Sequence, residues 1–231
     1  MIITESEAIM SDQPKPNVAA SLFTIHKVIS RSLDVSIESA QDFAVRGFPE
    51  EKPVDGFINY IKALISILHA HHLVEDELVF PYFKEKLPDI PYHLLNDQHQ
   101  EMAAILKEIE VLTDKIAERS EDAAGLTNLK TLKKIRDKWH PHIDIEETYF
   151  EIQKVGEMLP VEEHLRLMKL FAEHSQKHSG PAYLTIPFVL YNLPRETREI
   201  MTKAMPSEVV EQLVPIVWKE KWESMTPFLL L

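Results

Sequence analysis

The most constraining feature of the sequence is a group of histidines and acids set into an apolar helix pattern, in the stretch HAHHLVEDELVFPYF at residues 69–83. Residues spaced alternately three and four apart share one face of a helix, and this is the face that packs. That face is predicted to carry Phe57, Ile61, Leu64, Leu68, His71, Glu75, Leu78 and Tyr82. Because an ionised carboxylate buried without a partner is costly, Glu75 needs a cation, a paired charge or a proton. The histidine one turn before it suggests a metal.

Three further long helices are predicted, and each also places a histidine on its apolar face. The first of the four starts after a candidate N-cap, Asn17. The predicted helices cover residues 18–46, 56–87, 92–119 and a range from about 120–125 through Tyr149. Their inward polar residues are His26, His71 with Glu75, His99, and His142 with Glu146. The last helix therefore repeats the His-xxx-Glu spacing of the second.

Four long helices with short connections are typical of an up-down-up-down four-helix bundle, so the predicted fold is all-α. His26 and His99 lie about eight residues from the starts of their helices, and the two His-xxx-Glu pairs lie about 12 to 16 residues from the ends of theirs. With a rise of about 1.5 Å per residue, these positions have nearly the same depth. The six polar side chains are therefore predicted to converge in one layer of the bundle.

The pattern changes after Pro160, where prolines begin to divide the chain into shorter pieces. A helix is predicted over residues 161–178, and Gly180-Pro181 should end it. The aromatic residues of the following segments provide apolar surface that can dock on the bundle. We therefore predict three parts: a flexible lead-in at residues 1–16, the bundle at 17–158, and a C-terminal helical extension packed on it at 159–231.

Composition narrows the possible chemistry and the possible partners. The 231 residues contain no cysteine, so a metal must be held by nitrogen and oxygen atoms. The net charge of −12 argues against a nucleic-acid surface, which requires a concentrated basic face. The sequence contains neither an apolar run of membrane-spanning length nor the pattern of a secretory signal, so we expect a cytoplasmic protein without a membrane partner. The pattern does not indicate an oligomeric state.

The six inward residues, four imidazoles and two carboxylates from four helices, suit a pair of metal ions. A lone histidine on an apolar face is more often a hydrogen-bonded core residue than a ligand. Four ligands would suffice for zinc, whereas six ligands with open positions suit two metals that share bridging carboxylates and bind oxygen. The joint pattern, unlike its single members, therefore indicates a metal site.

The segments HLVEDELVFP, with His71 before it, and HIDIEETYF resemble the hemerythrin-like family, the HHE cation-binding domains, over roughly residues 18–155. The resemblance implies a four-helix bundle with a non-haem di-iron site. It implies two iron ions, cycling between Fe²⁺ and Fe³⁺, with an oxo, hydroxo or water bridge as an option. The ligands implied are His26, His71, Glu75, His99, His142 and Glu146.

The chain departs from the oxygen-carrying hemerythrins on its third helix. Those proteins use two histidines four residues apart, whereas Leu95 and Ala103 occupy the positions four residues from His99 here. His72 is the nearest spare imidazole for the missing ligand, and water is the alternative. Four of the remaining histidines are interpreted as surface residues or as partners of the ligands: His69, His93, His140 and His164. His174 and His178 lie one turn apart and could bind a metal, but no acid or third histidine accompanies them in a recognisable pattern, so they are interpreted as exposed helix residues.

Three functions fit this pattern. The first is binding of dioxygen, or of a reactive oxygen or nitrogen species, at a di-iron site. The second is a di-iron oxidoreductase of the oxygenase, oxidase or peroxidase type, which uses dioxygen or peroxide on a small organic substrate; the C-terminal extension would then help to form a cavity near the metals. The third is iron storage or sensing. A pocket for an organic molecule beside the irons would favour the enzyme.

Overall fold

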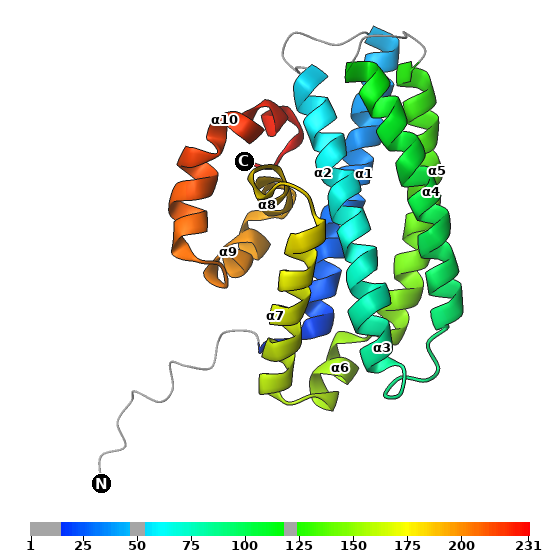
Figure 1. Ribbon diagram of the computed structural model, residues 1–231, viewed down its shortest axis with the longest axis vertical. Helices are drawn as coiled ribbons and strands as arrows, with labels where there is room; N and C mark the ends of the chain where they lie inside the picture. Colours follow the sequence, from blue (N-terminus) through cyan, green and yellow to red (C-terminus); the bar gives the residue numbers. More distant parts are fainter. Residues whose placement is uncertain (1–14, 47–53, 118–123) are drawn as a thin grey trace.

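Four long helices form the main body of the computed structural model, which describes residues 15–46, 54–117 and 124–231, with side chains from Leu129 onward in the last range. They are α1 (Val18–Arg46), α2 (Val54–Val74), α4 (Tyr92–Ala117) and α5 (Ala124–Tyr149). Helix α1 contacts α2 and α5, and α4 contacts the same two helices. Figure 1 shows them side by side, with consecutive helices running in opposite directions. The prediction of an all-α helical bundle is confirmed, and no strand occurs in the described ranges.

The start of α1 is held by two side chains. Asn17 accepts hydrogen bonds from the backbone N–H groups of Ala19 (3.0 Å) and Ala20 (3.2 Å), so the predicted N-cap is confirmed. The N–H of Val18 donates to Nδ1 of His164 at 3.2 Å. His164 is 2% exposed. The interpretation of His164 as a surface residue or a partner of the ligands is wrong. This histidine is buried against α1, which is distant from it in sequence, so the pattern of its own helix does not reveal the contact. Most of the predicted lead-in at residues 1–16 lies outside the described residues.

The second helix continues past α2, but its hydrogen-bonding pattern changes at the acidic residues. Residues Glu75–Val79 form a π-helix, η2, and Phe80–Phe83 form a last α-helical turn, α3. The N–H of Phe80 donates to the carbonyl of Glu75, five residues back. A π-turn accommodates an additional residue, so the buried face moves by one position.

This shift corrects the predicted inward face beyond Glu75. Val79 and Phe83 are fully buried, whereas Leu78 and Tyr82, which a regular α-helix would turn inward, are half-buried. The helix also ends at Phe83, four residues before the predicted end at Leu87. A sequence ladder assumes one period throughout, so it cannot anticipate a change of period inside the helix.

The core consists of two large apolar clusters with a polar layer between them. One cluster extends from Val28 along α1 and from Phe57 to Leu68 along α2, and it includes residues of the C-terminal segment. The other gathers near the opposite end of the bundle and includes Leu22 and Val74. In α1 and α2, the predicted metal ligands lie in sequence between these clusters. The apolar clusters therefore enclose the polar layer from both sides.

The C-terminal segment is also helical and packs on one side of the bundle. Its elements are α6 (Ile152–Met158), α7 (Val161–His178), α8 (Ala182–Tyr191), α9 (Arg195–Lys203), η3 (Val209–Val217), α10 (Lys219–Trp222) and η4 (Glu223–Phe228). Helices α7 and α8 and the 3₁₀-helix η4 contact α2, as Figure 1 shows on the left of the bundle. The predicted break after α7 is confirmed at Gly180, whose φ of +76° favours glycine.

A polar network fixes this segment to the bundle. Tyr60 on α2 donates a hydrogen bond to the side-chain oxygen of Asn192 at 2.7 Å. Arg31 on α1 donates to the same oxygen and to the carbonyl of Phe228 at 3.1 Å. Burial raises the pKa of Tyr60 to about 12, so its hydroxyl remains a donor at neutral pH. The network therefore supplements apolar contacts such as the packing of the Phe57 and Phe228 rings.

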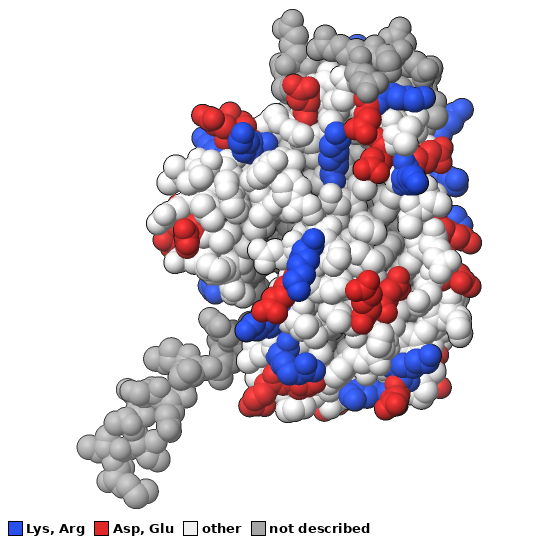
Figure 2. Space-filling view, in the orientation of Figure 1, with Lys and Arg blue, Asp and Glu red and all other residues white. Residues whose placement is uncertain are grey.

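Charged side chains lie mainly on the surface. Figure 2 shows basic and acidic groups interspersed over the visible face. The surface also carries exposed ion pairs such as Lys62–Asp114. Exposed pairs of this kind contribute little to stability. In the described part of the chain, no helix combines the length and the apolar character that crossing a lipid bilayer requires.

Replacing Gly56 by alanine tests the docking of the C-terminal segment on α2. A Cβ atom at this position would overlap the backbone carbonyl of Ser224, which cannot move without displacing η4. We expect Gly56→Ala to lower the free energy of unfolding by about 1–3 kcal/mol, as overpacking usually does. Urea unfolding followed by circular dichroism measures the change.

Gly156→Ala is the matched control. Its Cβ would approach only the end of the Asn17 side chain, at 2.7 Å, which can shift without moving the backbone. The shift would weaken the cap of α1 by about 0.5–2 kcal/mol, and the gain in helix propensity of about 1 kcal/mol offsets it, so the net effect should stay within about 1 kcal/mol. Equal stability of Gly56→Ala and the unmodified protein would contradict the close approach of α2 and η4.

Candidate metal centre

All six predicted ligands meet in the polar layer between the two apolar clusters. Each is at most 5% exposed. They come from α1 (His26), α2 (His71), the first residue of η2 (Glu75), α4 (His99) and α5 (His142 and Glu146). Their ligand atoms form two groups, and within each group the atoms lie no more than 4.8 Å apart. The predicted convergence is therefore what the structure shows, while the binding of metal by these atoms remains a prediction.

The two groups share both carboxylates and differ in their imidazoles. One group contains His26 and His71, and we call it the first half-site. The other contains His99 and His142, and we call it the second half-site. Glu75 and Glu146 belong to both.

Each carboxylate directs one oxygen toward each half-site. Oε1 of Glu75 lies 3.3 Å from Nε2 of His71, and its Oε2 lies 3.6 Å from Nε2 of His99. Oε2 of Glu146 lies 3.4 Å from Nε2 of His26, and its Oε1 lies 3.4 Å from Nε2 of His142. This arrangement is the one that two bridging carboxylates require.

Three of the four imidazoles are oriented through their other ring nitrogen. A hydrogen bond at Nδ1 leaves Nε2 directed at the cluster and fixes the ring, as in many metal sites. The partners are Oε1 of Glu147 for His26 (2.9 Å), Oδ1 of Asp76 for His99 (2.7 Å) and Oε1 of Gln98 for His142 (2.8 Å). Among the described residues, His71 alone of the four has no hydrogen-bond partner.

Sequence analysis did not identify these orienting partners. Asp76 in particular lies off the predicted inward face, and its side chain is 30% exposed, but its carboxylate also reaches His99. One signal was available: each predicted bridging glutamate is followed directly by a second acid, Asp76 after Glu75 and Glu147 after Glu146. No comparable signal marks Gln98.

A fifth imidazole, that of His72, adjoins the second half-site. His72 is 5% exposed, and its ring stacks on that of His99 with 4.0 Å between centroids. The ligand atoms of His72, His99 and His142 lie within 4.8 Å of one another. His72 thus lies where the sequence analysis sought a replacement for the missing histidine of the third helix.

Buried polar atoms in this layer lack hydrogen-bond partners within the described ranges. They are Nε2 of His26, His71 and His72, Oε2 of Glu75, and both carboxylate oxygens of Glu146. Buried polar groups are normally satisfied, and leaving one without a partner costs about 1–3 kcal/mol. A cation would satisfy these atoms together, so the residues present fit a metal centre made of nitrogen and oxygen ligands.

Burial also sets the protonation states of the metal-free cluster. It raises the pKa of Glu75 well above its usual value, and repulsion from Glu146 adds to the effect. Burial raises the pKa of Glu146 as well. It lowers the pKa of His71 far below the usual value, and lowers that of His142 to about 2, with neighbouring histidines adding to both shifts. The imidazoles of His71 and His142 are therefore neutral near pH 7, which is the form that binds metal.

The remaining histidines lie outside the cluster. His69, His93 and His140 are exposed, as predicted. On α7, Nε2 of His174 lies 2.8 Å from a carboxylate oxygen of Glu77. His178 on the same helix is exposed. None of these residues joins the candidate metal centre.

These features define a helical bundle with a buried histidine and glutamate site for cations. The family model described as "Hemerythrin HHE cation binding domain" matches residues 19–152, which is more than half of the chain and includes every predicted ligand. The chain therefore belongs to the hemerythrin HHE cation-binding family. No curated protein and no solved structure gives a significant match. The matched range ends before α7, so the family match does not cover α7–η4.

Replacing Glu146 by methionine tests whether the metal-free layer stores unfavourable energy. Methionine has a similar size and removes the two oxygens without partners, so Glu146→Met should raise the free energy of unfolding by about 1–2 kcal/mol in the presence of a chelator. Glu146→Gln, which keeps a buried polar group, is the control and should give no such gain. Urea titrations of the chelated proteins measure both. A methionine variant no more stable than the glutamine variant would contradict the prediction.

Proposed function

We propose that this protein holds two iron ions in the bundle and binds dioxygen, or a reactive oxygen or nitrogen species, at that centre. The observation that carries the proposal is the division of the cluster into two half-sites joined by Glu75 and Glu146, each with one oxygen toward either half. A single ion would not require both carboxylates to be shared. Nitrogen and oxygen ligands without cysteine also suit iron.

The proposed ligands divide between the ions according to the observed groups. His26 and His71 would hold the first ion, His99 and His142 the second, and the glutamates both. We include His72 as a ligand of the second ion. The positions four residues from His99 support this assignment, because Leu95 is buried in the apolar core and Ala103 is exposed. In this proposal α4 has no second histidine ligand, and His72 on α2 would take its place.

When bound, the two irons would supply electrons and open coordination positions for a small oxidant. The chain's own residues would prepare the site for them. The apolar clusters on both sides exclude water, and the hydrogen bonds of Glu147, Asp76 and Gln98 hold three imidazoles in place. With two imidazoles in the first half-site and three in the second, the first half-site is the more open side.

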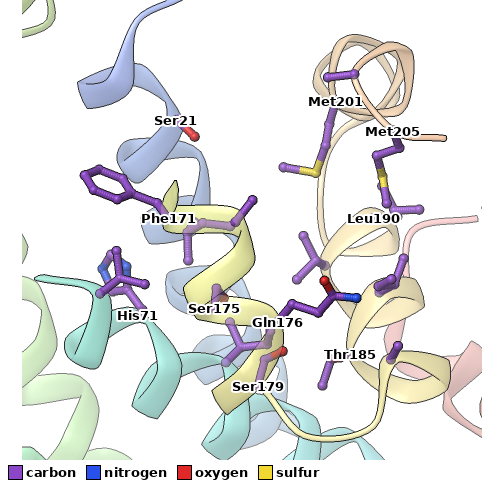
Figure 3. A pocket seen from close by; sticks show the side chains of 18 of the residues that line it. Ser21, His71, Phe171, Ser175, Gln176, Ser179, Thr185, Leu190, Met201 and Met205 are labelled. Carbon is purple, nitrogen blue, oxygen red and sulfur yellow. The ribbon is translucent and has the colours of Figure 1, made fainter. Parts of the chain in front are cut away.

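A second function, oxidation of a small organic substrate, is favoured by a specific observation. A cavity of about 490 Å³ lies between the bundle and the C-terminal segment, and His71 is among its lining residues (Figure 3). This is a typical volume for a small-molecule site and far more than a diatomic gas requires. The sequence analysis identified such a pocket as the feature that would favour an enzyme. We therefore retain a di-iron oxidoreductase as the alternative.

Iron content tests the shared role of the carboxylates. Because Glu146 would bridge both ions, Glu146→Ala should reduce the iron content from about two per chain to near zero. His72→Ala should weaken iron retention by about 10–100-fold in competition with a chelator. His69→Ala, an exposed substitution on the same helix as His72, is the control and should retain all iron. Elemental analysis after anaerobic loading gives the ratios. Unchanged iron in Glu146→Ala or in His71→Ala would refute the proposed centre.

The absorption spectrum of the reduced, iron-loaded protein tests the reaction with oxygen. If the site binds oxygen reversibly, a new visible band should appear when dioxygen is added and disappear when the gas is removed. Lasting oxidation of both irons would instead favour the oxidoreductase, because such a centre needs a reductant or a substrate to return to its starting state. No spectral change with dioxygen would contradict both functions.

A further inference from the structure

The cavity beside His71 has walls from two parts of the chain. Its inner side comes from α1 and α2, and its outer side comes from α7, α8, α9 and the start of η3. Figure 3 shows His71 on one side of the cavity and Met201 and Met205 on the other. The outer wall lies beyond residue 152, where the family match ends. The family match therefore assigns no role to this cavity.

The chemistry of the walls indicates what the cavity can accept. Among the described lining residues there is no aspartate, glutamate, lysine or arginine. Aliphatic and aromatic side chains predominate, and Met168, Met201 and Met205 add flexible thioethers that adapt to ligands of different shape. A charged group would enter without a counter-charge, at a high desolvation cost. The walls thus favour an uncharged ligand with a large apolar surface.

A few polar side chains interrupt this apolar lining. Ser21 on α1 and Ser175 and Gln176 on α7 line the cavity, and none of their side chains forms a hydrogen bond to another residue in the described ranges. In Figure 3 the Gln176 side chain extends from α7 toward α8. Small-molecule sites commonly combine apolar walls with a few such groups, which fix the orientation of the ligand. The ligand is therefore expected to carry a polar group.

His71 connects the cavity to the candidate metal centre. Its Nε2 lies 3.3 Å from Glu75, so the edge that carries Nδ1 is turned away from that carboxylate. The other three imidazoles of the predicted set use Nδ1 in a hydrogen bond, but His71 has no such partner among the described residues. An oxygen acceptor on a ligand could accept a hydrogen bond from the Nδ1–H of His71. It would then orient this ring as Glu147, Asp76 and Gln98 orient the other three imidazoles.

We propose that this cavity binds an uncharged, largely apolar organic molecule, such as a medium-chain alcohol or aldehyde, with its oxygen acceptor beside His71. The role of this molecule as a substrate rests on the proposed oxidoreductase function. Its binding does not, because the walls are complete without a metal. Binding to the metal-free chain and the iron content of the protein are therefore independent measurements.

Displacement of a neutral fluorescent probe tests the site. N-phenyl-1-naphthylamine is added to the metal-free, full-length protein, and 1-decanol, decanoate and decylamine are compared as competitors. We expect decanol to displace the probe at least about tenfold more effectively than either charged molecule, because a buried charge would find no partner in the cavity. Equal displacement by the three molecules would overturn the proposal.

Substitutions on opposite walls locate the binding. Ser175→Phe on α7 and Met205→Trp beyond α9 would each fill part of the cavity, and each should weaken probe and decanol binding at least about tenfold. Leu170→Phe, an exposed position on α7 outside the cavity lining, is the control and should bind as the unmodified protein does. Circular dichroism identifies folded variants. Undiminished binding in either folded wall variant would overturn the proposed location.

The position of the oxygen acceptor has a separate readout. In protein shown to contain iron, the protons next to the hydroxyl of bound decanol should relax faster than those of its terminal methyl group, since they would lie nearer the paramagnetic ions. A zinc-loaded sample provides the diamagnetic reference. Equal enhancement at the two ends would refute the placement of the acceptor beside His71 in a protein whose metal site is intact.

Discussion

Two glutamates buried in the middle of a helical bundle impose the strongest constraint on this structure. Glu75 and Glu146 are each at most 2% exposed, and their carboxylates lie together in one layer with the four predicted histidine ligands. Burial opposes the ionisation of both carboxyl groups, and repulsion from Glu146 adds to the effect on Glu75. Several polar atoms in the layer have no partner among the described residues. The layer divides the apolar core into two clusters, so the bundle forgoes continuous packing there. A cation bound by these atoms would offset this cost.

The geometry of the layer depends on groups just outside it. The π-turn at Glu75–Val79 is a rare departure from α-helical hydrogen bonding, and it lies where Glu75 faces the cluster and Asp76 contacts His99. Such turns often occur at functional sites. On α5, the adjacent pair Glu146 and Glu147 has the same division of roles without a π-turn. Neighbouring acids therefore serve two purposes, one facing the metal ligands and one orienting an imidazole.

His71 belongs both to the predicted ligand set and to the wall of the cavity formed with the C-terminal segment. That segment is fixed by the buried network of Arg31, Tyr60 and Asn192. Its position next to α2 gives the bundle a second compartment, apolar and without charged lining residues in the described ranges. In the proposed function, the imidazole of His71 would therefore contact both an iron and the organic molecule.

Helical periodicity made much of this site predictable from the sequence. Because residues three and four apart share a face, His26, His99 and the two His-xxx-Glu pairs could be assigned to the core, and Asn17 to the start of α1. The partners of the ring nitrogens, the cap formed by His164 and the cavity could not be predicted, because each depends on contacts between helices distant in sequence. The sequence by itself determined that the six predicted ligands enter the core, since helix period decides locally which face of a long helix is buried. Only the tertiary structure decided which oxygen faces which imidazole and what surrounds His71, because helix rotation and packing set those distances.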